Sequence, residues 1–180
     1  MVPGMIRRCH ERDVETIWSI INEAATAYKG VIPADRWKEP YMSRDELQRE
    51  IDEDVAFWGY EVEGDLIGVM GVQHVAEVTL VRHAYVLPTR QGEGIGGRLL
   101  SRLRAQTDLP ILIGTWADAV WAVRFYEGHG FRLVSDEEEK KRLLRRFGRS
   151  PSDRLIPLWF WLTEYGSSAR GLSVGGMHSG

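Results

Sequence analysis

A glycine-rich loop between an apolar strand and a helix constrains this fold more than any other feature. Four of the seven residues from Gln91 to Gly97 are glycine, and they follow the apolar run 78–87. A helix is indicated directly afterwards by apolar residues at helical spacing: Ile95, Leu99, Leu100 and Leu103. The start of a helix presents unpaired N–H groups and the positive end of the helix dipole. Glycines let an anion approach these groups, so the segment predicts a site suited to a pyrophosphate.

Hydrophobic periodicity predicts further elements on both sides of this loop. Before it, the pattern favours helices over 14–28 and 43–54, and strands over 5–9, 55–62, 66–73 and 78–87. Ser43 and Glu46 form a capping-box pattern at the start of the second helix. After the loop we expect strands over 110–115, 131–134 and 156–162, and helices over 119–129 and 137–146. The order predicts an α/β fold with one mixed sheet.

Length and composition limit the classes of protein that fit. The 180 residues suit one domain, which we expect to span 1–165, followed by a flexible Gly/Ser-rich tail over 166–180. A net charge of −3 argues against a globally basic nucleic-acid binder, and a single cysteine, Cys9, allows no intramolecular disulfide. Apolar runs are too short to span a bilayer, and the N-terminus lacks a signal-peptide core. These features favour a cytoplasmic protein that binds neither nucleic acid nor membrane.

The glycines fit two patterns with different ligands. Gly92, Gly94 and Gly97 match the G-x-G-x-x-G of dinucleotide-binding folds, which would indicate a nicotinamide-dependent oxidoreductase. Three features disfavour that interpretation: residues 88–91 separate the loop from the strand, the preceding strands form an antiparallel meander, and Asp108 lies before the next strand instead of at its end. A P-loop does not fit, because no Gly-Lys-Ser/Thr closes the segment.

The other pattern is Gln-x-x-Gly-x-Gly, at Gln91, Gly94 and Gly96, preceded by the run 85–88, Tyr-Val-Leu-Pro. This arrangement resembles motif A of the GNAT acetyltransferase superfamily. A later segment, 122–131, resembles the superfamily's Ala-x-x-Phe-Tyr-x-x-x-Gly-Phe, and 28–33 resembles the link after its first helix. The resemblance spans residues 5–163. It implies a mostly antiparallel central sheet with a splayed parallel pair, flanked by helices.

Acetyl-CoA is the cosubstrate that this resemblance implies. The backbone at Tyr85 and Val86 would bind the pantetheine as an added strand would, and N–H groups of the loop would bind the pyrophosphate. The loop residues implied are Gln91, Gly92, Glu93, Gly94, Ile95, Gly96 and Gly97. Many members carry Asn where this chain has Ala119, and the adjacent Asp118 is the candidate replacement for its contact with the pantetheine arm.

Direct transfer to an amine requires two proton movements. Tyr126 matches the superfamily's general acid, which protonates the CoA thiolate, since a phenol and a thiolate are comparable in basicity. For the base we favour His83, because histidine commonly serves as a general base, and strand alternation places Arg82 and His83 on opposite faces. Glu77, Asp118 and a water chain are alternatives. The histidines lack metal-ligand spacing, so no metal is expected.

The acceptor is expected to be a primary amine, with a small molecule favoured over a protein amine. Its cleft would draw on aromatic residues that can receive a cation: Tyr28, Trp37, Tyr41, Trp58, Trp116 and Trp121. The principal alternative is a non-catalytic acyl-CoA-binding or regulatory domain. A homodimer is a further hypothesis, with the aromatic strand over 158–161 as its interface edge.

Overall fold

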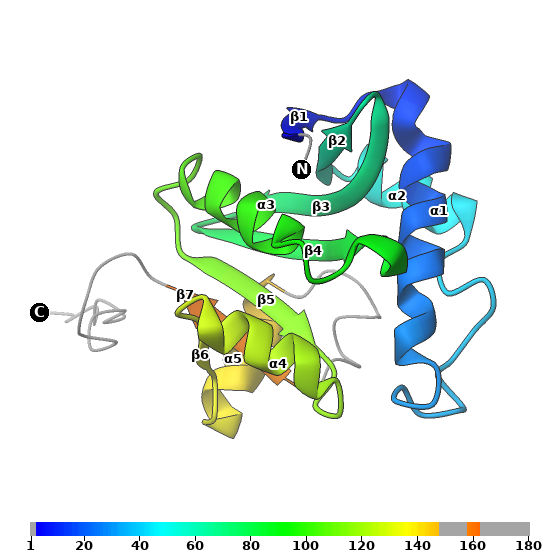
Figure 1. The fold of residues 1–180 in the computed structure, drawn as a ribbon. Coiled ribbons are helices and arrows are strands. Elements are labelled where there is room, and N and C mark those ends of the chain that lie inside the picture. Colours follow the sequence, from blue (N-terminus) through cyan, green and yellow to red (C-terminus); the bar gives the residue numbers. More distant parts are fainter. Residues whose placement is uncertain (1–2, 148–157, 163–180) are drawn as a thin grey trace, which may run out of the picture.

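A computed structural model describes residues 3–147 and 158–162 of the chain (Figure 1). In these residues one seven-stranded sheet has the order β1-β2-β3-β4-β5-β7-β6. Its strands are β1 (Met5–Arg8), β2 (Ala56–Val62), β3 (Asp65–Val75), β4 (Val78–Val86), β5 (Ile111–Thr115), β6 (Arg132–Leu133) and β7 (Leu158–Leu162). The helices are α1 (Val14–Ala25), α2 (Arg44–Asp52), α3 (Ile95–Arg104), α4 (Val120–Gly128) and α5 (Glu137–Phe147). Three short 3₁₀ helices are η1 (Glu11–Asp13), η2 (Thr26–Tyr28) and η3 (Pro88–Arg90).

The parallel pair at the centre of the sheet is β4 and β5, while every other neighbouring pair is antiparallel. The two strands pair only from Thr79 with Ile111 to Val81 with Ile113. Both strands continue beyond these residues without pairing to each other, so the sheet is splayed there. This confirms the predicted mixed sheet with a splayed parallel pair.

The central strands β3 and β4 are buried on both sides, because successive side chains point to opposite faces of the sheet. Helices cover both of these faces (Figure 1). On one face Met70, Val72 and Val81 pack against apolar residues of α3 and α4. On the other face Val69 packs against α1 and α2, and Leu80 packs against Leu143 of α5. Helices α3 and α4 therefore cover one face, and α1, α2 and α5 cover the other.

A β-bulge interrupts β4 at Arg82. His83 pairs with Gly71 and Val81 pairs with Val72, so Arg82 is an extra residue in the ladder. Its guanidinium donates to the Gln73 side chain at 3.0 and 2.8 Å, and that side chain donates to the C-cap carbonyl of α2. His83 contacts α2 as well. The expectation that Arg82 and His83 lie on opposite faces is therefore wrong, because the bulge shifts the alternation by one residue.

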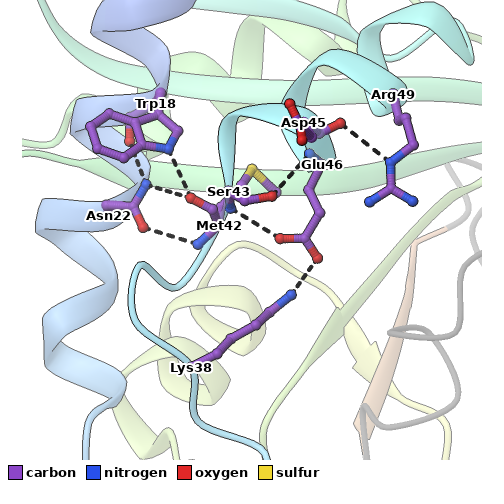
Figure 2. Close-up of polar contacts among 8 residues, drawn as sticks. All are labelled: Trp18, Asn22, Lys38, Met42, Ser43, Asp45, Glu46 and Arg49. Carbon is purple, nitrogen blue, oxygen red and sulfur yellow. Dashed lines mark hydrogen bonds and ion pairs between the residues drawn. The ribbon is translucent and has the colours of Figure 1, made fainter.

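The link between α1 and α2 is fixed to α1 by Asn22 (Figure 2). The Asn22 amide accepts from the N–H of Met42 at 2.9 Å and donates to its carbonyl at 3.0 Å. Trp18 donates its indole N–H to the same carbonyl at 2.8 Å. Helix α2 then begins with the predicted capping box, in which Ser43 and Glu46 each bond the other's backbone N–H. These contacts fix where α2 lies against the sheet.

Two expectations concern the C-terminal part of the chain. Strand β7 lies between β5 and β6 and is paired on both sides, so it does not present the free edge suggested for a homodimer. The last strand in the sequence is not the edge strand here, because β6, which precedes β7 in the chain, occupies the outer position. The predicted tail, 166–180, lies outside the described residues. Within the part of the chain that the structure describes, no helix is long and apolar enough to cross a membrane.

Candidate functional site

A cavity of about 550 Å³ opens between β4, the glycine loop, α3 and α4. This volume lies in the range of small-molecule sites. Its lining also includes Tyr28 of η2 and Trp121 of α4. Nine of the twelve residues predicted for the site line it: Tyr85, Val86, Gln91, Gly92, Gly94, Ile95, Gly96, Gly97 and Tyr126.

The glycine loop leads into α3 through a left-handed residue. Gly94 is the N-cap of α3 with φ of 75°, a conformation that glycine adopts without strain. Its carbonyl accepts from the N–H of Arg98 at 3.1 Å, so the N–H groups of the first turn before Arg98 have no carbonyl partner within α3. Arg90 lines the cavity and is bound by Glu93 at 2.7 and 3.0 Å. These N–H groups and the helix dipole favour an anion at this end of the cavity.

The first turn of α3 is packed closely against α4. A Cβ on Gly96 would lie 3.2 Å from the ring of Phe125, and a Cβ on Gly97 would lie 2.8 Å from Nε2 of His129. All four residues line the cavity. A Cβ at position 97 would therefore displace the His129 ring, and one at position 96 would press on the Phe125 ring.

The C-terminal end of β4 forms another wall. From His83 onward β4 pairs with β3 but not with β5, which leaves the edge that faces β5 unpaired by a strand. The Gln91 side chain reaches back along this edge and donates to the carbonyl of Val86 at 3.3 Å. An extended ligand can therefore lie along β4 between the two splayed strands.

Tyr126 of α4 lies where the large cavity meets the splay. Only 8% of the residue is exposed, and its ring packs edge-on against Phe125 and Phe131, with centroids at 5.3 and 5.8 Å. Burial raises the pKa of the Tyr126 phenol well above its usual range, and the nearby Tyr28 raises it further. The phenol therefore retains its proton throughout the neutral pH range.

A second, small cavity of about 40 Å³ occupies the opening between β4 and β5. It is lined by Arg82, His83, Gly114 and Thr115, and it shares Tyr28, Ala84, Tyr85 and Tyr126 with the large cavity. The two cavities therefore meet at common walls, one of which is Tyr126. His83 lines only the small cavity, on the side of the sheet that α1 and α2 cover.

Aromatic side chains surround the place where the cavities meet. Tyr85 packs against Tyr28 and Tyr41 with centroids at 6.5 Å in each pair, and Tyr28 packs against Trp121 at 5.3 Å. Burial raises the pKa of Tyr28 to about 12, and burial also raises that of Tyr85. Both phenols are neutral near pH 7, so the walls are uncharged rings suited to an apolar or cationic group.

Some residues singled out from the sequence lie elsewhere. Glu93 and Asp118 line neither cavity, and Trp58 packs beneath Arg102 of α3, 5.6 Å from its guanidinium. Ala119 is fully buried as the N-cap of α4.

Residues 3–147 and 158–162 contain no cluster of three or more His, Cys, Asp or Glu placed to hold a metal ion.

Other lining residues were missed. They include Arg90, Phe125 and His129, of which Phe125 and His129 lie in segment 122–131, which carries the resemblance. His129 follows Phe125 by four residues and Tyr126 by three, about one helical turn, and this spacing was the signal that could have identified His129.

Comparison with known proteins agrees with this architecture. PaiA N-acetyltransferase from Thermoplasma acidophilum, solved in complex with coenzyme A, has a TM-score of 0.64 at 21% identity, over 75% of this chain and 93% of that one. The acetyltransferase yncA from Salmonella typhimurium, solved with acetyl-CoA, has a TM-score of 0.61 at 19% identity, over 93% and 97%. The ribosomal-protein-S18-alanine N-acetyltransferase from Escherichia coli has a TM-score of 0.61 at 18% identity, over 74% of this chain and 80% of that one.

None of the curated proteins matches this chain. Similarity to solved structures at these identities establishes the fold and leaves the acceptor open. The sequence model of the family described as "Acetyltransferase (GNAT) domain" matches residues 20–145, which include the glycine loop, β4, β5 and α4. Because this match covers more than half of the chain, the protein belongs to the GNAT acetyltransferase family.

Proposed function

We propose that this protein transfers an acetyl group from acetyl-CoA to a primary amine, with a small molecule as the favoured acceptor. The observation that carries the proposal is the position of Tyr126. It stands at the junction of a large cavity bordered by a glycine loop and a small cavity at the splayed strands. That arrangement suits a reaction in which two substrates enter from opposite sides and meet at one proton donor.

The residues of the large cavity fit acetyl-CoA. The first turn of α3 presents N–H groups for the pyrophosphate, and the close packing of Gly96 and Gly97 leaves this surface free of side chains. The unpaired edge of β4 at Tyr85 and Val86 suits the extended pantetheine arm. Acetyl-CoA supplies the thioester, with the CoA thiolate as leaving group. Asp118 is exposed and lines neither cavity, which weighs against the pantetheine contact expected of it.

Tyr126 is proposed as the general acid. Its raised pKa keeps the phenol protonated until the leaving sulfur needs a proton. His83 is proposed as the base that receives the amine proton, because it lines the small cavity with Tyr126. The aromatic rings of Tyr28 and Tyr85 form the remaining walls and suit the cationic form in which an alkylamine arrives.

Ligand binding can be tested by thermal unfolding with acetyl-CoA, CoA, NADH and NADPH. A ligand at a hundredfold excess over Kd stabilises the native state by about 2.7 kcal/mol, which raises Tm by roughly 5–10 °C for a protein of this size. We expect acetyl-CoA and CoA to raise Tm and the nicotinamides to leave it unchanged. A response to the nicotinamides alone would contradict the assignment of the glycine loop.

Catalysis is tested by thiol release with benzylamine, butane-1,4-diamine and a lysine peptide as acceptors. We expect Tyr126→Phe to lower kcat about a hundredfold with little change in the KM for acetyl-CoA, since general acids contribute 10²–10⁴-fold. Tyr60→Phe is the matched control, because Tyr60 is also a buried tyrosine and lines neither cavity. Unchanged kcat in Tyr126→Phe between pH 6 and 9 contradicts the acid role. Acetyl-CoA binding without product from any amine identifies the protein as a non-catalytic acyl-CoA-binding domain.

A further inference from the structure

His83 is held by a carboxylate from a different element. Its Nε2 bonds to Oε2 of Glu50 on α2. Only 8% of the His83 side chain is exposed and 24% of the Glu50 side chain, so water competes weakly for this contact. No hydrogen-bond partner for Nδ1 of His83, which is also buried, lies among residues 3–147 and 158–162. One ring nitrogen is therefore engaged, and the other is unpaired within the described residues.

The imidazole ring has little freedom to turn. It stacks between Phe57 and Tyr85, with centroids at 5.6 and 6.1 Å and interplanar angles of 15° and 30°. Gly71 of β3 lies opposite, where a Cβ would be 3.1 Å from the ring. Phe57 comes from β2 and Gly71 from β3, so the sheet fixes the plane of the ring on the side where α2 lies.

Glu50 is fixed in turn by the anchor of α2. It lies one turn after Glu46, whose capping box with Ser43 begins the helix, and Asn22 fixes the preceding Met42 (Figure 2). Burial alone would raise the pKa of Glu50, but the charge and hydrogen bond of His83 and the charge of Arg82 lower it below its usual range. Glu50 is therefore an anion at neutral pH.

This geometry selects one form of the neutral imidazole. A carboxylate only accepts hydrogen bonds, so Nε2 must carry a proton in order to bond Glu50. In neutral imidazole the other nitrogen then has a lone pair, and here that nitrogen is Nδ1. His83 lines the small cavity beside Tyr28 and Tyr126, where the acceptor amine is proposed to enter.

We propose that Glu50 is a positioning residue that holds the His83 proton on Nε2, so that Nδ1 accepts the proton of the acceptor ammonium. This inference rests on the proposed function. In the step, the ammonium gives one proton to Nδ1, its nitrogen bonds to the acetyl carbon, and the carbon–sulfur bond breaks. The sulfur takes the Tyr126 hydroxyl proton, the second proton from nitrogen returns to the Tyr126 oxygen, and solvent takes the proton from His83. Glu50 stabilises the imidazolium that forms.

The pH dependence of this step is set by the groups around His83. Helix α2 contributes Glu50 and, farther away, Glu46, while β2 and β3 present the uncharged Phe57 and Gly71. The remaining titratable or charged neighbours are Arg82 and Tyr85 on β4, Tyr28 in η2 and Tyr126 in α4. The tyrosines are neutral near pH 7, and Arg82 is bonded to Gln73. Glu50 is therefore the anion in contact with the imidazolium.

The proposal is tested by the pH profile of Glu50→Gln in the full chain, with the most rapidly acetylated of the three amines above. Without the carboxylate the imidazolium loses its stabilising charge, so we expect the acid limb of kcat to move about one pH unit lower and the plateau to fall about tenfold. Asp52→Asn is the matched control, because it removes an exposed carboxylate from the same helix without contacting His83. A Glu50→Gln profile that coincides with that of Asp52→Asn overturns the proposal.

A second measurement needs no acceptor. Long-range ¹H–¹⁵N NMR spectra of the protein identify which nitrogen of a neutral imidazole carries the proton. We expect a proton on Nε2 of His83 and a bare Nδ1. A proton on Nδ1 overturns the role of Glu50 even if amines are acetylated. Absence of any acetylated amine, with Nε2 protonated, contradicts the proposed function and leaves the positioning of His83 by Glu50 intact.

Discussion

Substitution of Gly97 by Ala tests how tightly the cavity wall is built. The new Cβ would lie 2.8 Å from Nε2 of His129, closer than a normal contact. The His129 ring cannot easily withdraw, because Nδ1 donates to the Phe125 carbonyl at 2.7 Å and the ring packs on Phe125 at 4.3 Å. Such overpacking typically costs about 1–3 kcal/mol. Alanine is favoured over glycine inside a helix by about 1 kcal/mol, which offsets part of this cost.

The expected balance is a loss of about 1 kcal/mol in the free energy of unfolding, equal to a fall in Tm of roughly 2–4 °C. Because Gly97 and His129 both line the large cavity, we also expect the KM for acetyl-CoA to rise about tenfold, or about 1.4 kcal/mol. Gly128→Ala is the control, since nothing lies within 4 Å of the Cβ that it would add. It should leave KM unchanged.

A double-mutant cycle with His129→Ala isolates the contact. Without the ring, the methyl group added by Gly97→Ala meets no obstruction and only the helix preference of alanine remains. We therefore expect Gly97→Ala to stabilise that background by about 1 kcal/mol. The coupling energy between the two positions is then about 2 kcal/mol, measured by urea unfolding. An equal effect of Gly97→Ala in both backgrounds would refute the reasoning, because it would show that the ring and the new methyl do not compete for space.

Two further predictions concern stability. Asn22→Ala removes both bonds to the Met42 backbone, so we expect a loss of about 1–2 kcal/mol in urea unfolding, and an unchanged midpoint would contradict the anchor described for α2. Hydrogen bonds from Arg7, together with one from the His10 N–H, lower the pKa of Asp13 to about 2, against the partial opposition of burial. Its contribution of about 1–2 kcal/mol is therefore complete above about pH 4 and lost as pH falls toward 2, so the difference in stability between wild type and Asp13→Asn should shrink over that range.

Most of the fold was predictable because local patterns and long-range packing agree. The capping box at Ser43 and Glu46 begins α2 as expected, and the apolar residues from Ile95 to Leu103 are buried beneath the sheet. Nine of the twelve predicted site residues line one cavity, since the loop and α4 meet at the carboxyl ends of β4 and β5. Hydrophobic periodicity predicts which side chains of a helix or strand share a face, because side chains repeat about every 3.6 residues in a helix and every two residues in a strand.

The contacts between distant segments could not be predicted in the same way. Glu50 lies on α2 and meets His83 only because the Asn22 anchor sets where α2 rests on the sheet. Neither residue has a local pattern that marks it as a partner of the other. The contact of His129 with Gly97 could not be predicted for the same reason, since helix packing brings the two residues together.

The bulge at Arg82 connects the shape of the site to its chemistry. Pairing between β4 and β5 ends at Val81, one residue before the bulge, and a bulge increases the local twist of a strand. The extra residue therefore coincides with the point where β4 departs from β5 and the small cavity begins. It also shifts the alternation, so that Arg82 and His83 both face α2 and His83 reaches Glu50. A strict two-residue repeat cannot represent either effect, because it includes neither the extra residue at the start of the opening nor the change of face that brings His83 to Glu50.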